Sequence, residues 1–248
     1  CGTLELCGKL PQTVSGSALE VRKLILNNTS RQGVTLSSAV TVTETYESNG
    51  GPCTQAGGKL NLDLSKLNEA STLLGDVHLT EPTTLKDRTV TVDGSLWLDG
   101  AALTLENATL IVRGSLRSTG TDCALTIGAD SAVQVRNLVQ LSGTTLTADG
   151  ALTIGGDCVL TGGSLTGAGQ IAFGGDLYSG KAAVSLTGDT RFDGRLAQRV
   201  SGSSLQFASL TFSNPSRSGV WLLSTVNYSG TLTTGQTRIN NAERLVQK

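Results

Sequence analysis

Several residue types that usually carry chemistry are scarce in this chain of 248 residues. It contains no methionine, one histidine and four prolines, and aromatic residues make up 4% of it. The absence of methionine predicts a processed protein or a cut fragment rather than a complete translation product with its initiator. The single histidine, His78, has no obvious triad partners. The chain has no Cys-x-x-Cys pair, so the spacing of its cysteines does not indicate a zinc site.

Charge and long apolar runs are scarce as well. Charged residues make up 16% of the chain and the net charge is −1, so the whole molecule offers no field that would steer nucleic acid or an anionic membrane. No apolar run is long enough to span a bilayer. No catalytic, metal or cofactor motif stands out, and we expect no metal array and no cofactor. The sequence therefore says more about the fold than about the function.

A Leu-Thr pair recurs along most of the chain at intervals of 19 to 24 residues, with a mean near 22. The leucines are Leu79, Leu103, Leu125, Leu146, Leu165, Leu186, Leu210 and Leu232. Between them, apolar residues alternate in short pieces that are separated by glycine and aspartate corners, which is typical of half-buried strands joined by tight turns. Three pieces per repeat predict a three-sheet parallel β-helix, or β-solenoid, of about 22 residues per coil.

Three segments follow from the regularity of this pattern. Residues 1–35 are less regular and are expected to form N-terminal strands or a cap. Residues 36–238 are expected to form the solenoid, because the gaps from Leu36 to Leu60 and from Leu60 to Leu79 match the later intervals. In residues 239–248 glycine disappears and charges return, which predicts a C-terminal cap or a linker.

The repeating region resembles the right-handed parallel β-helices of bacterial cell-surface proteins, such as adhesins and autotransporter passengers. The resemblance lies in the uneven period, the Gly-Asp corners and runs such as Leu103-Thr104-Leu105-Glu106-Asn107 and Leu125-Thr126-Ile127-Gly128. It implies an all-β fold, export to the extracellular space or the bacterial cell surface, and a role in adhesion or surface structure. The partner would be a surface glycan, other copies of the chain or other domains.

The five cysteines leave several interpretations open. Cys7 and Cys53 are a candidate disulfide that would tie the first coil to a loop, while Cys123 and Cys158 suit small residues packed within the coils. Cys1 followed by Gly2 suits the lipid-bearing cysteine of a bacterial lipoprotein, and it equally suits a fragment boundary.

Outward positions beside the inward leucines carry small residues. In one column the candidates are Thr104, Thr126, Thr147, Thr166, Thr187, Thr211 and Thr233. Stacked about 4.8 Å apart, such residues would form a flat, uncharged ladder like the ice-contacting face of solenoid ice-binding proteins. The alternative interpretation is that threonine simply favours exposed strands and stabilises them through cross-strand pairs. A third possibility is that the face packs against another copy or another domain.

Two tryptophans, Trp97 and Trp221, are predicted to point outward between inward apolar neighbours. Gly94-Ser95-Leu96-Trp97 aligns with Gly114-Ser115-Leu116-Arg117, which places Arg117 one coil away in a cation–π contact. Exposed aromatic rings on a rigid sheet suit stacking on sugars, so these residues form a candidate glycan-binding strip. The alternative is that a loop or the N-terminal segment covers each tryptophan.

An enzyme is the first alternative function, because parallel β-helices include pectate lyases and polygalacturonases. Most acidic residues lie at glycine-flanked corners. An aspartate at a turn can hydrogen-bond its own backbone, so its presence there does not require a catalytic role. Asp189 and Asp193 with Arg191 are the best catalytic candidates, although no catalytic residue is assigned. The sequence favours a non-enzymatic structural or adhesive module, followed by a carbohydrate-active enzyme and then an ice-binding protein.

Overall fold

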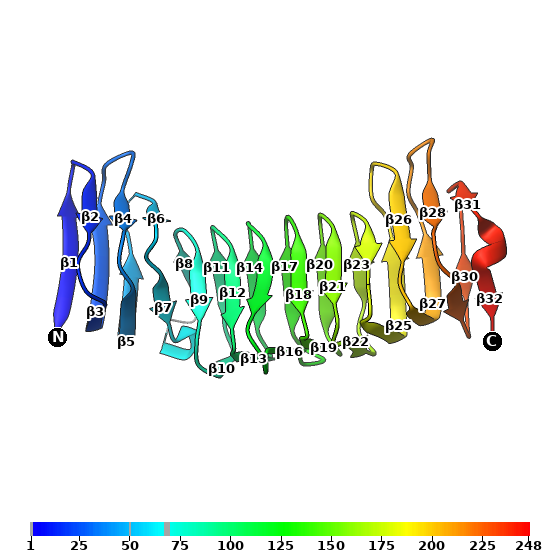
Figure 1. The fold of residues 1–248 in the computed structure, drawn as a ribbon, viewed down its shortest axis with the longest axis horizontal. Helices are drawn as coiled ribbons and strands as arrows, with labels where there is room; N and C mark the ends of the chain where they lie inside the picture. The colour runs from blue at the N-terminus through cyan, green and yellow to red at the C-terminus, as the bar shows by residue number, and fades with distance from the viewer. Residues whose placement is uncertain (1, 50, 67–69) are drawn as a thin grey trace.

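The chain folds as an all-β parallel solenoid of about 12 turns, with roughly 20 residues in each turn. The computed structural model describes residues 2–49, 51–66 and 70–248. Figure 1 shows the coils side by side along one long axis, with the two termini at opposite ends. The only helical elements in the described residues are two 3₁₀ turns, η1 (Leu64–Lys66) and η2 (Ala242–Arg244). The predicted fold class is confirmed.

The first sheet runs the whole length of the solenoid as thirteen parallel strands. In spatial order they are β1 (Thr3–Gly8), β3 (Leu19–Asn28), β5 (Val40–Ser48), β7 (Leu60–Leu62), β9 (Val77–Leu79), β12 (Leu96–Asp99), β15 (Leu116–Thr119), β18 (Val139–Ser142), β21 (Cys158–Thr161), β24 (Leu177–Tyr178), β26 (Gln198–Ser201), β28 (Val220–Leu222) and β31 (Ile239–Asn240). Each middle coil contributes one of these strands.

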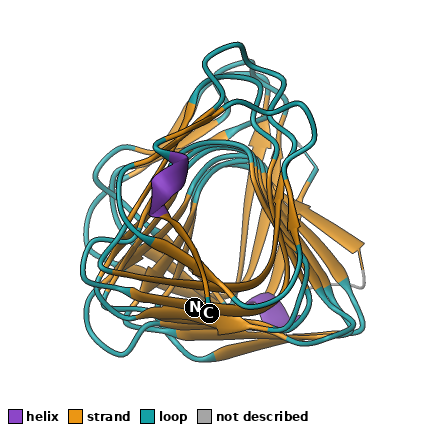
Figure 2. Cartoon of the chain, turned by 90° about the vertical axis from the view of Figure 1, so that its right-hand side faces the viewer, coloured by secondary structure: helices purple, strands orange, loops and turns teal. Residues whose placement is uncertain are grey.

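A second, sixteen-stranded sheet forms the other two sides of the solenoid as two arms. The first arm contains β10 (Thr83–Lys86), β13 (Ala102–Glu106), β16 (Ala124–Ile127), β19 (Thr145–Ala148) and β22 (Ser164–Gly167). The second arm contains β8 (Ala70–Leu73), β11 (Thr89–Val92), β14 (Thr109–Val112), β17 (Ala132–Val135), β20 (Ala151–Ile154) and β23 (Ile171–Phe173). Both arms pair with the long strand β25 (Ala183–Phe192), which in turn pairs with β27 (Ser204–Phe212). The strands β29 (Val226–Tyr228), β30 (Leu232–Thr233) and β32 (Leu245–Gln247) follow. Figure 2 shows the resulting three-sided cross-section, in agreement with the expected three strands per coil.

The end coils belong to the same ladder as the middle coils. In the first coils, a small sheet of β2 (Gln12–Val14), β4 (Val34–Leu36) and β6 (Cys53–Gln55) adds to the main sheets. The parallel pairing of β3 with β5 carries the first sheet across residue 36, where the sequence predicted a boundary. At the other end, residues 239–248 form β31, η2 and β32, which pair with β28 and β29 as a last coil.

The Leu-Thr pairs do not follow one strand column. Leu103, Leu125, Leu146 and Leu165 pair successively in the first arm, as expected. Leu79 lies in β9 of the first sheet, whereas Leu210 and Leu232 pair with each other where β27 and β30 continue the second arm. The 24-residue intervals before Leu103 and before Leu210 therefore include a change of position around the coil. This explains why the mean interval exceeds the actual coil length.

The inside of the solenoid is a single aliphatic cluster built by strict strand alternation. Leucine and valine side chains are buried in nearly every coil, and each fully buried one stabilises the fold by about 1.5–3 kcal/mol. Near the C-terminal end the filling becomes aromatic. The ring of Phe192 stacks on Phe173 at 5.1 Å and on Phe212 at 5.5 Å between centroids.

The candidate disulfide is not present. Cys7 is an exposed free thiol on β1, whereas Cys53 is a buried free thiol on β6. Burial raises the pKa of the Cys53 thiol to about 11, and that of the fully buried Cys158 to about 12. Cys123 and Cys158 are packed inside the coils, as expected. The question of lipid attachment at Cys1 lies outside the described residues.

Candidate functional site

An outward row of polar and aromatic side chains crosses four coils of the first sheet. Successive strands pair His78 with Trp97, Trp97 with Arg117 and Arg117 with Gln140. The His78 and Trp97 rings are stacked, with 5.6 Å between centroids and 6° between planes. The Arg117 guanidinium carbon lies 5.3 Å from the centre of the Trp97 ring and this side chain donates a hydrogen bond to Gln140. The cation–π contact expected from the sequence is confirmed.

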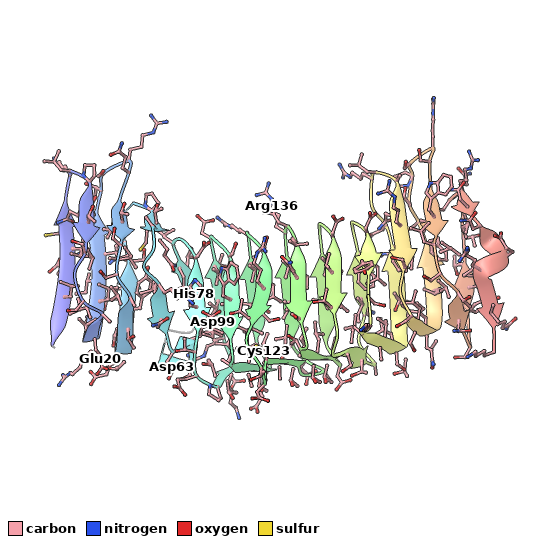
Figure 3. All side chains as sticks on the ribbon, in the orientation of Figure 1. Glu20, Asp63, His78, Asp99, Cys123 and Arg136 are labelled. Carbon is pink, nitrogen blue, oxygen red and sulfur yellow. The ribbon has the colours of Figure 1, made fainter. Side chains whose placement is uncertain are left out.

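Asp99 anchors this row from the end of β12. Its carboxylate lies 2.7 Å from Nδ1 of His78 and 2.8 Å from Nζ of Lys59, and it accepts a hydrogen bond of 2.5 Å from the hydroxyl of Thr119. Burial would raise the pKa of Asp99, but the bonds from Lys59, Thr119 and His78 outweigh it and hold the pKa below its usual range. Figure 3 shows His78 and Asp99 side by side on the sheet. The carboxylate is therefore satisfied by its own neighbours.

The stacked row leaves Trp97 closed to a sugar. His78 and Arg117 belong to the strands on opposite sides of Trp97, so they cover the two faces of its ring. Stacking on a sugar needs a free face, and the His78 ring and the Arg117 guanidinium both pack against this half-buried ring. Trp221 is different, because it is 40% exposed and its neighbours in the row are Arg199 and Asn240. The structure thus separates the two tryptophans that the sequence treated alike.

Four of the seven candidate ladder threonines form a continuous row. Thr104, Thr126, Thr147 and Thr166 pair in register on the outer side of the first arm. Thr84 precedes this row and Ser185 follows it. Thr187 lies two positions further along β25, and Thr211 and Thr233 pair with each other in the continuation of the second arm. Their assignment to the same row was wrong, because the Leu-Thr pairs change position around the coil.

The best catalytic candidates, Asp189 and Asp193, lie on either side of Arg191 in the sequence. Asp189 and Arg191 border a shallow hollow on the second arm, together with Thr153, Thr211 and Thr233. Asp193 follows the end of β25, and its carboxylate is 2.8 Å from Nε of Arg191. Glycoside hydrolysis needs two carboxyl groups that flank the scissile bond. The carboxylate of Asp193 is instead ion-paired with the arginine that lies between the two acids in the sequence.

The described residues contain no group of three or more histidine, cysteine or acidic side chains placed to hold a metal ion. Among the same residues, no helix is both long and apolar enough to cross a membrane.

A repeated loop structure is the feature that the sequence analysis missed. Residues 8–40 and 194–226 align without a gap at an offset of 186 residues, and 17 of the 33 positions are identical. The strands correspond as well: β2 with β26, β3 with β27 and β4 with β28. The pairing register is also the same, since Gln12 pairs with Val34 and Gln198 pairs with Val220. A search for periods near 22 residues could not find this signal, whereas a comparison of the two ends of the chain would have.

The C-terminal copy places two loops between the second arm and the first sheet, and the N-terminal copy places two loops between the first sheet and the small sheet of β2, β4 and β6. We call these loops the N-terminal tip (residues 8–11 and 29–33) and the C-terminal tip (residues 194–197 and 213–219). In Figure 1 the loops that join β1 to β2, β3 to β4, β25 to β26 and β27 to β28 rise above the shorter loops of the middle coils. Both tips therefore project from the same edge of the solenoid.

A buried asparagine holds each tip in the same way. Nδ2 of Asn28 donates to the carbonyl of Leu10 at 2.8 Å and to Oε1 of Gln12 at 2.7 Å, and Oδ1 accepts from the amide of Ser30 at 2.9 Å. Asn28 is 1% exposed.

The C-terminal tip repeats these contacts. Nδ2 of Asn214 donates to Leu196 at 2.7 Å and to Gln198 at 2.8 Å, and Oδ1 accepts from Ser216 at 2.8 Å. Asn214 is 2% exposed. Because buried side-chain amides must be hydrogen-bonded, the Asn28 network fixes the loop that carries Leu10 and the Asn214 network fixes the loop that carries Leu196.

The fold defines the class of the protein as a parallel β-solenoid. No protein-family model, no curated protein and no solved structure matches this chain.

Proposed function

We propose that this chain is a non-enzymatic structural and adhesive module of an exported bacterial surface protein. The observation that carries the proposal is the unbroken parallel ladder around one aliphatic core, which makes a stiff rod with regularly spaced outward side chains. Such a rod suits the display of binding groups along its sides. The satisfied Asp99 and the ion pair of Asp193 with Arg191 favour this role over polysaccharide cleavage.

The adhesive part of the proposal concerns Trp221. Its ring is 40% exposed and stands beside Arg199 on the neighbouring strand, in reach of a sugar that stacks on the ring and accepts hydrogen bonds from the guanidinium. Leu223 is 45% exposed two residues away and has no such chemistry. A glycan is therefore the expected ligand of this strip.

A glycan array with product analysis on every hit tests this function. We expect binding without cleavage, at least tenfold weaker in Trp221→Ala and unchanged in the matched variant Leu223→Ala. Cleavage of a bound glycan would replace the adhesive role with an enzymatic one. Equal binding by wild type and Trp221→Ala would remove the strip from the proposal, and absence of any glycan binding would leave only the structural role.

The in-register threonine row supports ice binding as a second candidate. It spans Thr104 to Thr166 with spacing of about 4.8 Å per coil. Bulky substitution at Thr147 or Thr166 should then remove thermal hysteresis. If the unmodified chain shows no thermal hysteresis, the threonine row only stabilises the sheet through cross-strand pairs.

A further inference from the structure

Two highly exposed leucines occupy equivalent positions on the two tips. Leu10 is 76% exposed and Leu196 is 80% exposed. Exposing a large apolar side chain at a loop apex is unfavourable in water, and here the buried Asn28 and Asn214 networks hold both leucines in that position. The arrangement occurs twice with matching hydrogen bonds, which argues for a use of the exposed side chain.

Each leucine is flanked by two cations. Lys9 and Arg31 accompany Leu10, while Arg195 and Arg217 accompany Leu196, and all four are exposed. None of the four makes an ion pair within the described part of the chain. The molecule as a whole has a net charge of −1, so the chain without these four cations is net negative and the tips stand out as positive.

The two tips are placed to touch one flat surface. They project from the same edge, and nine strand-to-strand steps of the first sheet separate them, which corresponds to about 43 Å. Between them the edge is recessed, as Figure 1 shows, and Arg136 lies on this middle part in Figure 3. Asp157 and Asp176 lie beside the C-terminal tip, in a hollow that Arg195 and Leu196 also line, and would disfavour a soluble polyanion lying along the edge. A planar partner would bridge the recess and meet only the tips.

From this geometry we propose that the two tips form a bivalent docking surface for an anionic lipid bilayer. Leu10 and Leu196 enter the interfacial region of the bilayer, and the four flanking cations contact lipid phosphates. The solenoid then lies side-on at the membrane without crossing it. Binding at one tip raises the effective concentration of the other, so the two act together.

Co-sedimentation with vesicles tests this proposal on the full chain. The probes are vesicles of phosphatidylcholine alone and of phosphatidylcholine with phosphatidylglycerol. Wild type should bind only the anionic vesicles and lose binding in high salt. Leu10→Ser should weaken binding by about tenfold or more, as should Leu196→Ser, and the double variant should abolish it because avidity is lost.

Matched controls separate the tips from general effects of charge or apolarity. Leu223→Ser removes an exposed leucine that lies outside the tips, and Lys181→Glu reverses an exposed charge on the loop between β24 and β25. Both should bind anionic vesicles as wild type does, whereas Arg31→Glu with Arg217→Glu should not bind. All these side chains are exposed, and unchanged circular dichroism and melting would confirm folding.

Three results would overturn the proposal. The first is no binding of wild type to anionic vesicles. The second is vesicle binding that survives the double leucine variant. The third is tip-dependent binding to dextran sulfate in solution without vesicle binding, which would assign the tips to a soluble polyanion. None of these results bears on the glycan strip at Trp221, which the array tests separately.

Discussion

The two copies of the tip motif share their loops but differ in what lies beneath them. Under the C-terminal tip, Gln198 is fully buried and also donates to the carbonyls of Phe173 and Gly175 in the preceding coil. Under the N-terminal tip, the equivalent Gln12 is only partly buried. The tips nevertheless have matching hydrogen bonds, with Gly33 at φ 65° and Gly219 at φ 64°. The comparison teaches that the tip is specified by its own residues rather than by its position in the solenoid.

The largest difference between the copies should come from the core. Phe192→Ala removes the middle ring of the Phe173, Phe192 and Phe212 stack and should lower the free energy of unfolding by about 3–5 kcal/mol. Leu6, at the equivalent position, is only partly buried, so Leu6→Ala should cost less than half as much. Urea unfolding measures both. Equal losses would show that the two ends are packed alike, against this structure.

Removal of the buried asparagines should have the next largest effect. Asn214→Ala leaves the carbonyl of Leu196 and the amide of Ser216 without their partner and should cost about 1–3 kcal/mol. Asn28→Ala should lose a similar amount, because the same contacts disappear. Hydrogen exchange at the amides of Ser30 and Ser216 should accelerate in the respective variants. Retained protection in either one would mean that its loop does not depend on the asparagine.

Acid should weaken the outward row of the first sheet before it affects the tips. The folded pKa of Asp99 is lowered, so its contribution to stability is fully present above the usual carboxyl pKa near 4 and is lost as pH falls through the lowered value. Asp99→Asn should cost about 1 kcal/mol at neutral pH. The gap between wild type and this variant should close on acidification. A gap that stays constant to low pH would contradict the lowered pKa.

The smallest effect should come from exchanging residues between the loops. The combination of Lys9→Arg, Pro11→Ala and Gln32→Ser gives the N-terminal tip the residues of its counterpart at every aligned position except Thr29 and should change stability by less than about 0.5 kcal/mol. Adding Thr29→Pro should cost about 1 kcal/mol, because the amide of Thr29 donates to Gly8 at 2.8 Å. Thermal unfolding of both variants measures the difference. A large loss in the first variant would show that the tips are not interchangeable.

The sequence predicted the fold because alternation and glycine corners determine a coil locally. It also predicted the contact of Trp97 with Arg117, since Gly-Ser-Leu runs of equal length precede both residues. It could not place Thr187, Thr211 and Thr233 in the correct outward rows, because all sides of the coil use similar Leu-Thr pairs and the lengths of the loops vary. The covered faces of the Trp97 ring depend on His78, which only the strand register brings into place.

The most direct test of the account is the distance between the two tips. Spin labels at Leu10→Cys and Leu196→Cys, with Cys1 and the exposed Cys7 replaced by serine, report this distance by double electron–electron resonance. A stiff solenoid with both tips on one edge predicts a narrow distribution centred at about 43 Å. A broad distribution, or a centre displaced by several coil spacings, would contradict a rigid rod that carries two equivalent tips.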